Sequence, residues 1–212
     1  MFYTNFLAPK DAQKHWWKDA DNKPFAVGGS IAHKQQFGKL DLVTSAFYLY
    51  RDSWNKDVFN RYGRFTLGTR YRVNDKLTVG FSSNLNAGNN QRFFYWKDNE
   101  ANAMIGSENT FNSTVNTRFN IDPFINYFDN AGNKHKIMGR FYGVNNEESG
   151  SRSNQSNLYY GEYQFQKRWE ESDLVLTTGL VGSFTDIDAE LYGGDQFQSN
   201  NYAAYLLSLI HI

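Results

Sequence analysis

The chain has no cysteine, only 3 prolines among its 212 residues, and no long run of apolar residues. The absence of cysteine excludes disulfide frameworks, thiolate metal sites and cysteine nucleophiles. No segment reaches the roughly 18 to 20 consecutive apolar residues that a membrane-spanning helix needs, and the mean hydropathy is −0.66. Any segment of this chain that spans a membrane would therefore have to be a β-strand.

Neither sign of charge is in excess, because 22 Lys and Arg balance 22 Asp and Glu. The chain thus lacks the overall positive field that attracts nucleic acid, and we expect no nucleic-acid partner. It contains no phosphate-binding glycine loop, no dinucleotide fingerprint and no nucleophile elbow. The 4 histidines are scattered without a metal-binding spacing. We expect no enzyme, no catalytic residue, no metal and no cofactor.

Aromatic residues are abundant: 18 Phe, 14 Tyr and 5 Trp make up 17% of the chain. Many of them alternate with polar residues, as in Phe65, Leu67 and Tyr71 against Arg64 and Arg70. Successive side chains of a strand point to opposite faces, so this pattern predicts strands with one apolar and one polar face. Four such hairpins are predicted, at residues 25–50, 64–86, 118–141 and 158–184.

The end of the chain is less regular. Both faces of the last strand in the fourth hairpin are apolar, which predicts a bulge near Gly182, and a ninth strand is predicted to begin at Tyr202.

Short turns within the hairpins alternate with longer polar segments between them. These segments are residues 52–60, 87–113, 145–157 and 185–200. Strict alternation of short and long links, with strands of about ten residues, is typical of outer-membrane barrels and not of soluble sandwiches. We therefore predict an all-β fold, an antiparallel transmembrane β-barrel of up-and-down strands. The chain would supply about eight to nine strands of a larger barrel.

Several phrases resemble the barrel of bacterial TonB-dependent receptors, in particular the Bacteroidetes-type members. They are WWKDADNKPF at 16–25, FGKLDLV at 37–43, YGRF at 62–65, YRVNDKLTV at 71–79, DPF at 122–124, GNKHKIMGRF at 132–141 and LYYGEYQFQ at 158–166. The resemblance covers nearly the whole chain. It implies that residues 1–212 are a single partial barrel domain that follows the plug domain of a bacterial outer-membrane receptor.

This resemblance implies that the intact protein, surrounded by outer-membrane lipid, imports a scarce nutrient with energy delivered by the TonB complex. Iron chelates, haem, cobalamin and oligosaccharides are all open as ligands. The plug that engages TonB and the closing strands are not in this sequence, and the first residues do not read as a secretion signal. We therefore expect the chain to be a fragment of the receptor.

Two groups of side chains are candidates for binding an extracellular small molecule or glycan. Aromatic rings predicted in loops can stack on sugars or chelates: Trp16, Trp17, Trp54, Phe94, Tyr95 and Trp96. Arginines are predicted to face the barrel interior, because an arginine in lipid costs about 2 to 4 kcal/mol near the midplane: Arg64, Arg70, Arg118 and Arg140. The simpler interpretation of the aromatic group is a girdle at the membrane interface, and that of the arginines is an ordinary solvated lining of the barrel.

Two other functions are compatible with the sequence. One is a small complete outer-membrane barrel that acts as an adhesin or a membrane enzyme. The other is a soluble, aromatic-rich β-sandwich that binds carbohydrate. Dependence on detergent separates the sandwich from both barrels, because only a barrel has a lipid-facing belt.

Overall fold

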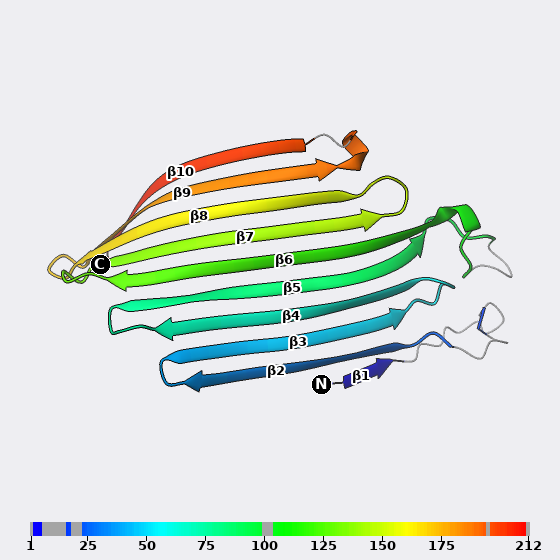
Figure 1. Ribbon diagram of the computed structural model, residues 1–212, viewed down its shortest axis with the longest axis horizontal. Coiled ribbons are helices and arrows are strands. Elements are labelled where there is room, and N and C mark those ends of the chain that lie inside the picture. Colours follow the sequence, from blue (N-terminus) through cyan, green and yellow to red (C-terminus); the bar gives the residue numbers. More distant parts are fainter. Residues whose placement is uncertain (1, 6–15, 18–22, 99–103, 194–195, 211–212) are drawn as a thin grey trace.

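The structure, a computed structural model, describes residues 2–5, 16–17, 23–98, 104–193 and 196–210. These residues form one antiparallel sheet in which ten strands lie in sequence order (Figure 1). The strands are β1 (Phe2–Asn5), β2 (Ala26–Phe37), β3 (Leu40–Asp52), β4 (Phe59–Arg72), β5 (Leu77–Phe93), β6 (Phe111–Phe128), β7 (Lys134–Glu148), β8 (Asn154–Trp169), β9 (Leu174–Ala189) and β10 (Gln196–Ile210). The predicted all-β, up-and-down arrangement is thus confirmed for β2 to β10.

Helical structure in the described part is limited to two single turns of 3-10 helix, η2 (Glu108–Thr110) and η3 (Glu190–Tyr192). No helix there is both long and apolar enough to cross a membrane.

Backbone pairing places alternate residues of every strand on two opposite faces. Ile31, Ala46, Phe65, Leu85 and Phe119 are successive partners across β2 to β6 and therefore share one face. We call this side the apolar face. The opposite side, which carries the Arg64, Asn86 and Arg118 row, is the polar face. The alternation predicted from the sequence for 64–72 is confirmed.

Aromatic rings form a continuous row on the apolar face. The ring of Phe141 lies 6.2 Å from that of Phe119 and 5.1 Å from that of Tyr159, and Tyr159 lies 6.0 Å from Phe184. Cross-strand aromatic pairs contribute roughly 0.2 to 1 kcal/mol each to a sheet. The row therefore links β6, β7, β8 and β9 by side chains as well as by their backbones.

The sheet has almost no interior of its own. Apart from proline and glycine, only Trp17, Ala26 and Leu49 are buried apolar residues in the described part of the chain. On the apolar face Ile31 is 72% exposed and Phe65 is 47% exposed. An apolar sheet face is stable when another layer covers it, and the described residues supply no second layer.

All four predicted long connections exceed the observed ones, which are residues 53–58, 94–110, 149–153 and 190–195. β5 continues to Phe93, so residues 87–93 are strand, and β7 and β8 are joined by residues 149–153 alone. The predicted strict alternation of short and long links is therefore wrong, because the 129–133 turn is as long as the 149–153 link. Polar residues at these strand ends keep their backbone pairing but lose the apolar alternation that marks a strand in sequence.

Two expectations for the last strands are also wrong. β10 begins at Gln196, six residues before the predicted start at Tyr202. Gly182 pairs with Gly161 on one side and with Tyr202 on the other in unbroken register, so the predicted bulge is absent. The two apolar faces of β9 reflect its composition and not a change of register.

Hydrogen bonds to Asp129 order the turn between β6 and β7. Its Oδ1 accepts from the backbone N–H groups of Ala131 at 2.8 Å and Asn133 at 2.9 Å. Gly132 takes a left-handed conformation with φ of 77°, which glycine adopts without strain. The Asn133 side chain, which donates to Asp129 Oδ2 at 2.8 Å, lowers the pKa of Asp129 from 3.8 to about 2.

This lowered pKa predicts an acid-sensitive turn. Ionised Asp129 stabilises the fold above about pH 4, and that contribution is lost as the pH falls towards about 2. The difference in melting temperature between the wild type and Asp129→Asn should therefore be largest at neutral pH and shrink over this interval. Asp75→Asn, in the β4–β5 turn, is the control. A difference for Asp129→Asn that does not change with pH would contradict the assignment.

Candidate binding face

The four candidate arginines all lie on the polar face. Arg64 Nε donates to Asn86 Oδ1 at 2.7 Å. Arg118, the next residue in that row, makes no side-chain hydrogen bond or ion pair with another described residue. Arg70 Nη2 lies 2.8 Å from Asp41 Oδ2. The sequence thus predicted the shared face of these arginines but not their partners.

Arg140 makes the best-formed ion pair of this face. Its Nε and Nη2 donate to the two carboxylate oxygens of Asp122 at 2.6 and 2.9 Å. Asn120 Nδ2 also donates to Asp122 Oδ2 at 2.9 Å. Two parallel hydrogen bonds fix both side chains in one orientation, so the Arg140 guanidinium is held against Asp122 of the neighbouring strand.

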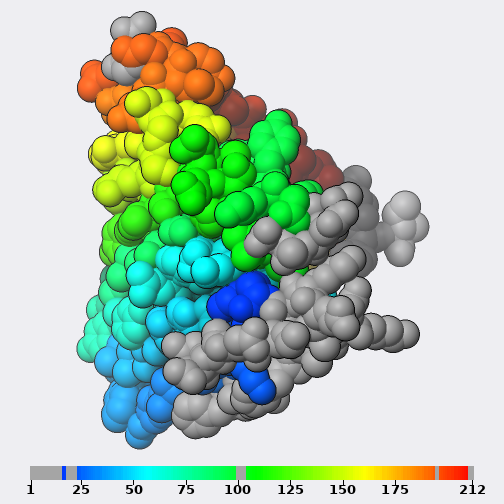
Figure 2. All heavy atoms as spheres, turned by 90° about the vertical axis from the view of Figure 1, so that its right-hand side faces the viewer, coloured from blue at the N-terminus to red at the C-terminus, as the bar shows by residue number. Residues whose placement is uncertain are grey.

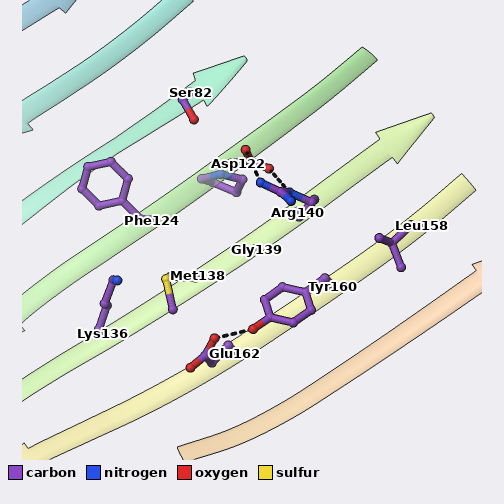
Figure 3. A pocket seen from close by; sticks show the side chains of 11 residues that line it. Ser82, Asp122, Phe124, Lys136, Met138, Gly139, Arg140, Leu158, Tyr160 and Glu162 are labelled. Atoms are coloured by element: carbon purple, nitrogen blue, oxygen red, sulfur yellow. Dashed lines mark hydrogen bonds and ion pairs between the residues drawn. The ribbon is translucent and has the colours of Figure 1, made fainter. Parts of the chain in front are cut away.

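A hollow of about 430 Å³ lies beside this ion pair on β5 to β8. Figure 3 shows Asp122 and Arg140 at one end of it and Tyr160 and Glu162 at the other. Phe124 and Met138 also line the hollow. The hollow therefore combines apolar side chains with the partnered charges of Asp122, Arg140 and Glu162, and Lys136 lines it as well.

A tyrosine from β10 reaches Glu162 across the intervening strand. Tyr205 Oη donates to Glu162 Oε1 at 2.6 Å and accepts from Gln164 Nε2 at 3.0 Å. Tyr160 donates to the other Glu162 oxygen. Gly179, which pairs with Tyr205, lies beneath its ring. A side chain on β9 at this position would occupy the space that the ring needs.

Substitution of Gly179 should disturb the hydrogen bond that Tyr205 makes to Glu162 across β9. An alanine Cβ at Gly179 would lie 2.5 Å from Tyr205 Oη, so Gly179→Ala should displace the ring and break its bond to Glu162. The free energy of unfolding should fall by about 1 kcal/mol, which is read from the shift in the midpoint of thermal unfolding in detergent. Gly161→Ala is the matched control, since nothing lies within 4 Å of its added Cβ. Equal losses from both variants would contradict the proposed contact.

The Asp122–Arg140 pair should be measurably coupled. Arg140 is 52% exposed, so solvent reduces the expected coupling to about 0.5 to 1 kcal/mol. A double-mutant cycle of Asp122→Asn and Arg140→Gln, read by unfolding, measures it directly. The same cycle with Arg118→Gln in place of Arg140→Gln should give no coupling. A coupling that is equal in the two cycles would show that the ion pair contributes nothing specific.

The candidate aromatics lie at the opposite end of the strands from the 129–133 turn. Trp16 Nε1 donates to the carbonyl oxygen of Trp54 at 2.8 Å, and its ring meets that of Trp17 edge-on at 5.6 Å. Figure 2 looks onto this end, where blue atoms of the N-terminal segment lie against the cyan atoms of the sheet. Trp17 is buried and serves packing, whereas Trp54 keeps an exposed ring surface.

Phe94, Tyr95 and Trp96 form a second aromatic group, on the 94–110 connection. All three are exposed. Trp96 pairs with Gly106 across this connection, and Arg152 lies 6.0 Å from the ring centroid of Phe94. In the described part of the chain neither aromatic group stacks on or hydrogen-bonds to the four candidate arginines. The structure therefore separates the two sets of predicted ligand-binding residues.

Sequence reasoning missed a second hollow, of about 450 Å³, at this end of the polar face. Its lining includes Trp54, Arg51, Asn60 and Asn90. The last three residues lie on separate strands and meet only through the register of the sheet. No spacing in the sequence marks them as neighbours.

Comparison with known proteins does not identify the chain: no protein-family model matches it, and no curated protein has a similar sequence. Among the described residues no three His, Cys, Asp or Glu side chains gather closely enough to hold a metal ion.

Proposed function

We propose that this chain forms part of the wall of an outer-membrane β-barrel, and that the whole protein is a TonB-dependent receptor that imports a scarce nutrient. The main support is the difference between the two faces of a single sheet. One face presents exposed apolar side chains, and the other presents charged side chains with polar partners. A barrel wall needs such a pair of faces, because one meets lipid and the other meets water.

The energetics favour lipid as the layer that covers the apolar face. Apolar area removed from water contributes about 25 cal/mol per Å², and most of this face is exposed in the described part. In the proposed orientation Arg64 and Arg140 face the interior and avoid the cost of about 2 to 4 kcal/mol for a cation at the bilayer midplane. Their partners Asn86 and Asp122 lie on that water-filled side.

The edges of the sheet also fit a larger barrel. Within the described residues β10 pairs only with β9, and a lipid-exposed strand edge would leave backbone groups without partners. In the proposed receptor, further strands pair with this edge and close the barrel. The assignment to TonB-dependent receptors rests on the phrases at 16–25, 71–79 and 132–141.

A charge scan across the two faces tests the proposal. Leu67→Arg and Phe81→Arg place a cation on the apolar face, whereas Thr66→Arg and Ser82→Arg place it on the polar face. The first pair should deplete the full-length protein from the outer-membrane fraction by at least about tenfold, measured by immunoblotting, and the second pair should leave most of it there. Equal depletion by all four variants would remove the face assignment and the lipid contact with it.

The sequence that flanks the gene separates the receptor from a small complete barrel. A plug-encoding segment upstream and further hairpins downstream would support the receptor. A secretion signal immediately upstream and a stop after one closing strand would replace it with the small barrel. A monodisperse monomer in the absence of detergent would exclude both and favour a soluble carbohydrate-binding protein.

A further inference from the structure

The hollow beside Trp54 presents a row of polar side chains from three adjacent strands. Arg51 on β3 pairs with Asn60 on β4, which pairs with Asn90 on β5. These three residues line the hollow, and so does Trp54, which is 38% exposed. Neighbouring strands are about 4.8 Å apart, so the row offers polar groups over about 10 Å.

These three side chains are free to meet a ligand, whereas their neighbours are occupied. Among the described residues, Arg51, Asn60 and Asn90 make no side-chain hydrogen bond or ion pair. By contrast Arg92, which also lines the hollow, lies 3.4 Å from the Glu148 carboxylate. Asp52 accepts from the Tyr50 hydroxyl at 2.6 Å.

The free groups define the chemistry of a ligand. A guanidinium binds a carboxylate through two parallel bonds. An amide side chain both donates to and accepts from hydroxyl groups, and an indole face packs against the apolar face of a sugar ring. We propose that this hollow binds an acidic saccharide, with a uronate carboxylate on Arg51, sugar hydroxyls on Asn60 and Asn90, and a ring against Trp54.

Other ligand classes use only part of this set. A neutral saccharide leaves the cation of Arg51 without a partner. An aromatic anion leaves the two amides without hydroxyl groups, and a polar group that is desolvated without a partner opposes binding. An acidic saccharide satisfies all four side chains. The inference rests on the proposed receptor function, because it takes this end of the barrel to be where the imported ligand is captured.

Calorimetric titration of the full-length protein with trigalacturonic acid tests the inference. The protein is held in lauryl dimethylamine oxide, a detergent without a sugar headgroup. The methyl-esterified trisaccharide is the matched ligand control, since it keeps the rings and hydroxyls and lacks the charge. The free acid should bind at least about tenfold more tightly than the ester.

Variants assign the interaction to this hollow. Arg51→Gln should weaken binding of the acid about tenfold and leave the affinity for the ester unchanged. Arg51→Lys keeps the charge but loses the two parallel bonds, so its affinity for the acid should lie between those of Arg51→Gln and the wild type. Trp54→Ala should weaken both ligands, and it retains the backbone carbonyl that Trp16 contacts. Arg61→Gln, at the same end of β4 but on the apolar face, is the control and should change neither affinity.

The outcomes separate this inference from the proposed function. Equal affinity for acid and ester, or an undiminished affinity in Arg51→Gln, overturns the acidic-saccharide site while the charge scan of the two faces still stands. The failure of the wild type to bind the acid has the same meaning. Loss of the face difference in the charge scan overturns the membrane barrel itself, and acid-specific binding in that case would belong to a carbohydrate-binding protein of another kind.

Discussion

Unbroken backbone register is the constraint on which the rest of this structure depends. From β2 to β10 each strand pairs with the next without a slipped residue. A slip of one residue would turn every side chain of a strand to the other face. Because no slip occurs, arginines from three different strands reach the same surface, and the aromatic row from Phe119 to Phe184 is continuous. Both faces are therefore a product of pairing, not of any single strand.

Local alternation in the sequence was sufficient to predict the faces of the strand interiors. Phe65 and Arg64 are sorted by parity alone, as are Leu85 and Asn86. The prediction failed where polar residues occupy both parities. An example is the end of β7, which continues through Glu148 although the sequence predicted a connection there. Backbone hydrogen bonds hold those ends together, and they are nearly independent of side-chain hydropathy.

The contacts between side chains of the polar face were harder to predict from the sequence. Asp122 and Arg140 are separated by the 129–133 turn, and their meeting depends on the length of that turn as well as on parity. Gly179 gave no signal, because its importance arises from the ring of Tyr205 above it. To predict the row of Arg51, Asn60 and Asn90, one would have to know the register of two strand pairs at once. Such sites depend on several pairings together, whereas a face depends on one periodicity.

The bond from Tyr205 to Glu162 gives β10 a second attachment, to a strand that is not its neighbour. Peeling β10 from the sheet therefore requires the rupture of this side-chain link in addition to the backbone ladder with β9. A sliding movement of β9 between β8 and β10 meets the same resistance, since the ring bridges over it at Gly179. The last three strands should consequently respond to force as one mechanical unit, and the detachment of β10 should be cooperative with the opening of the β8–β9 pair.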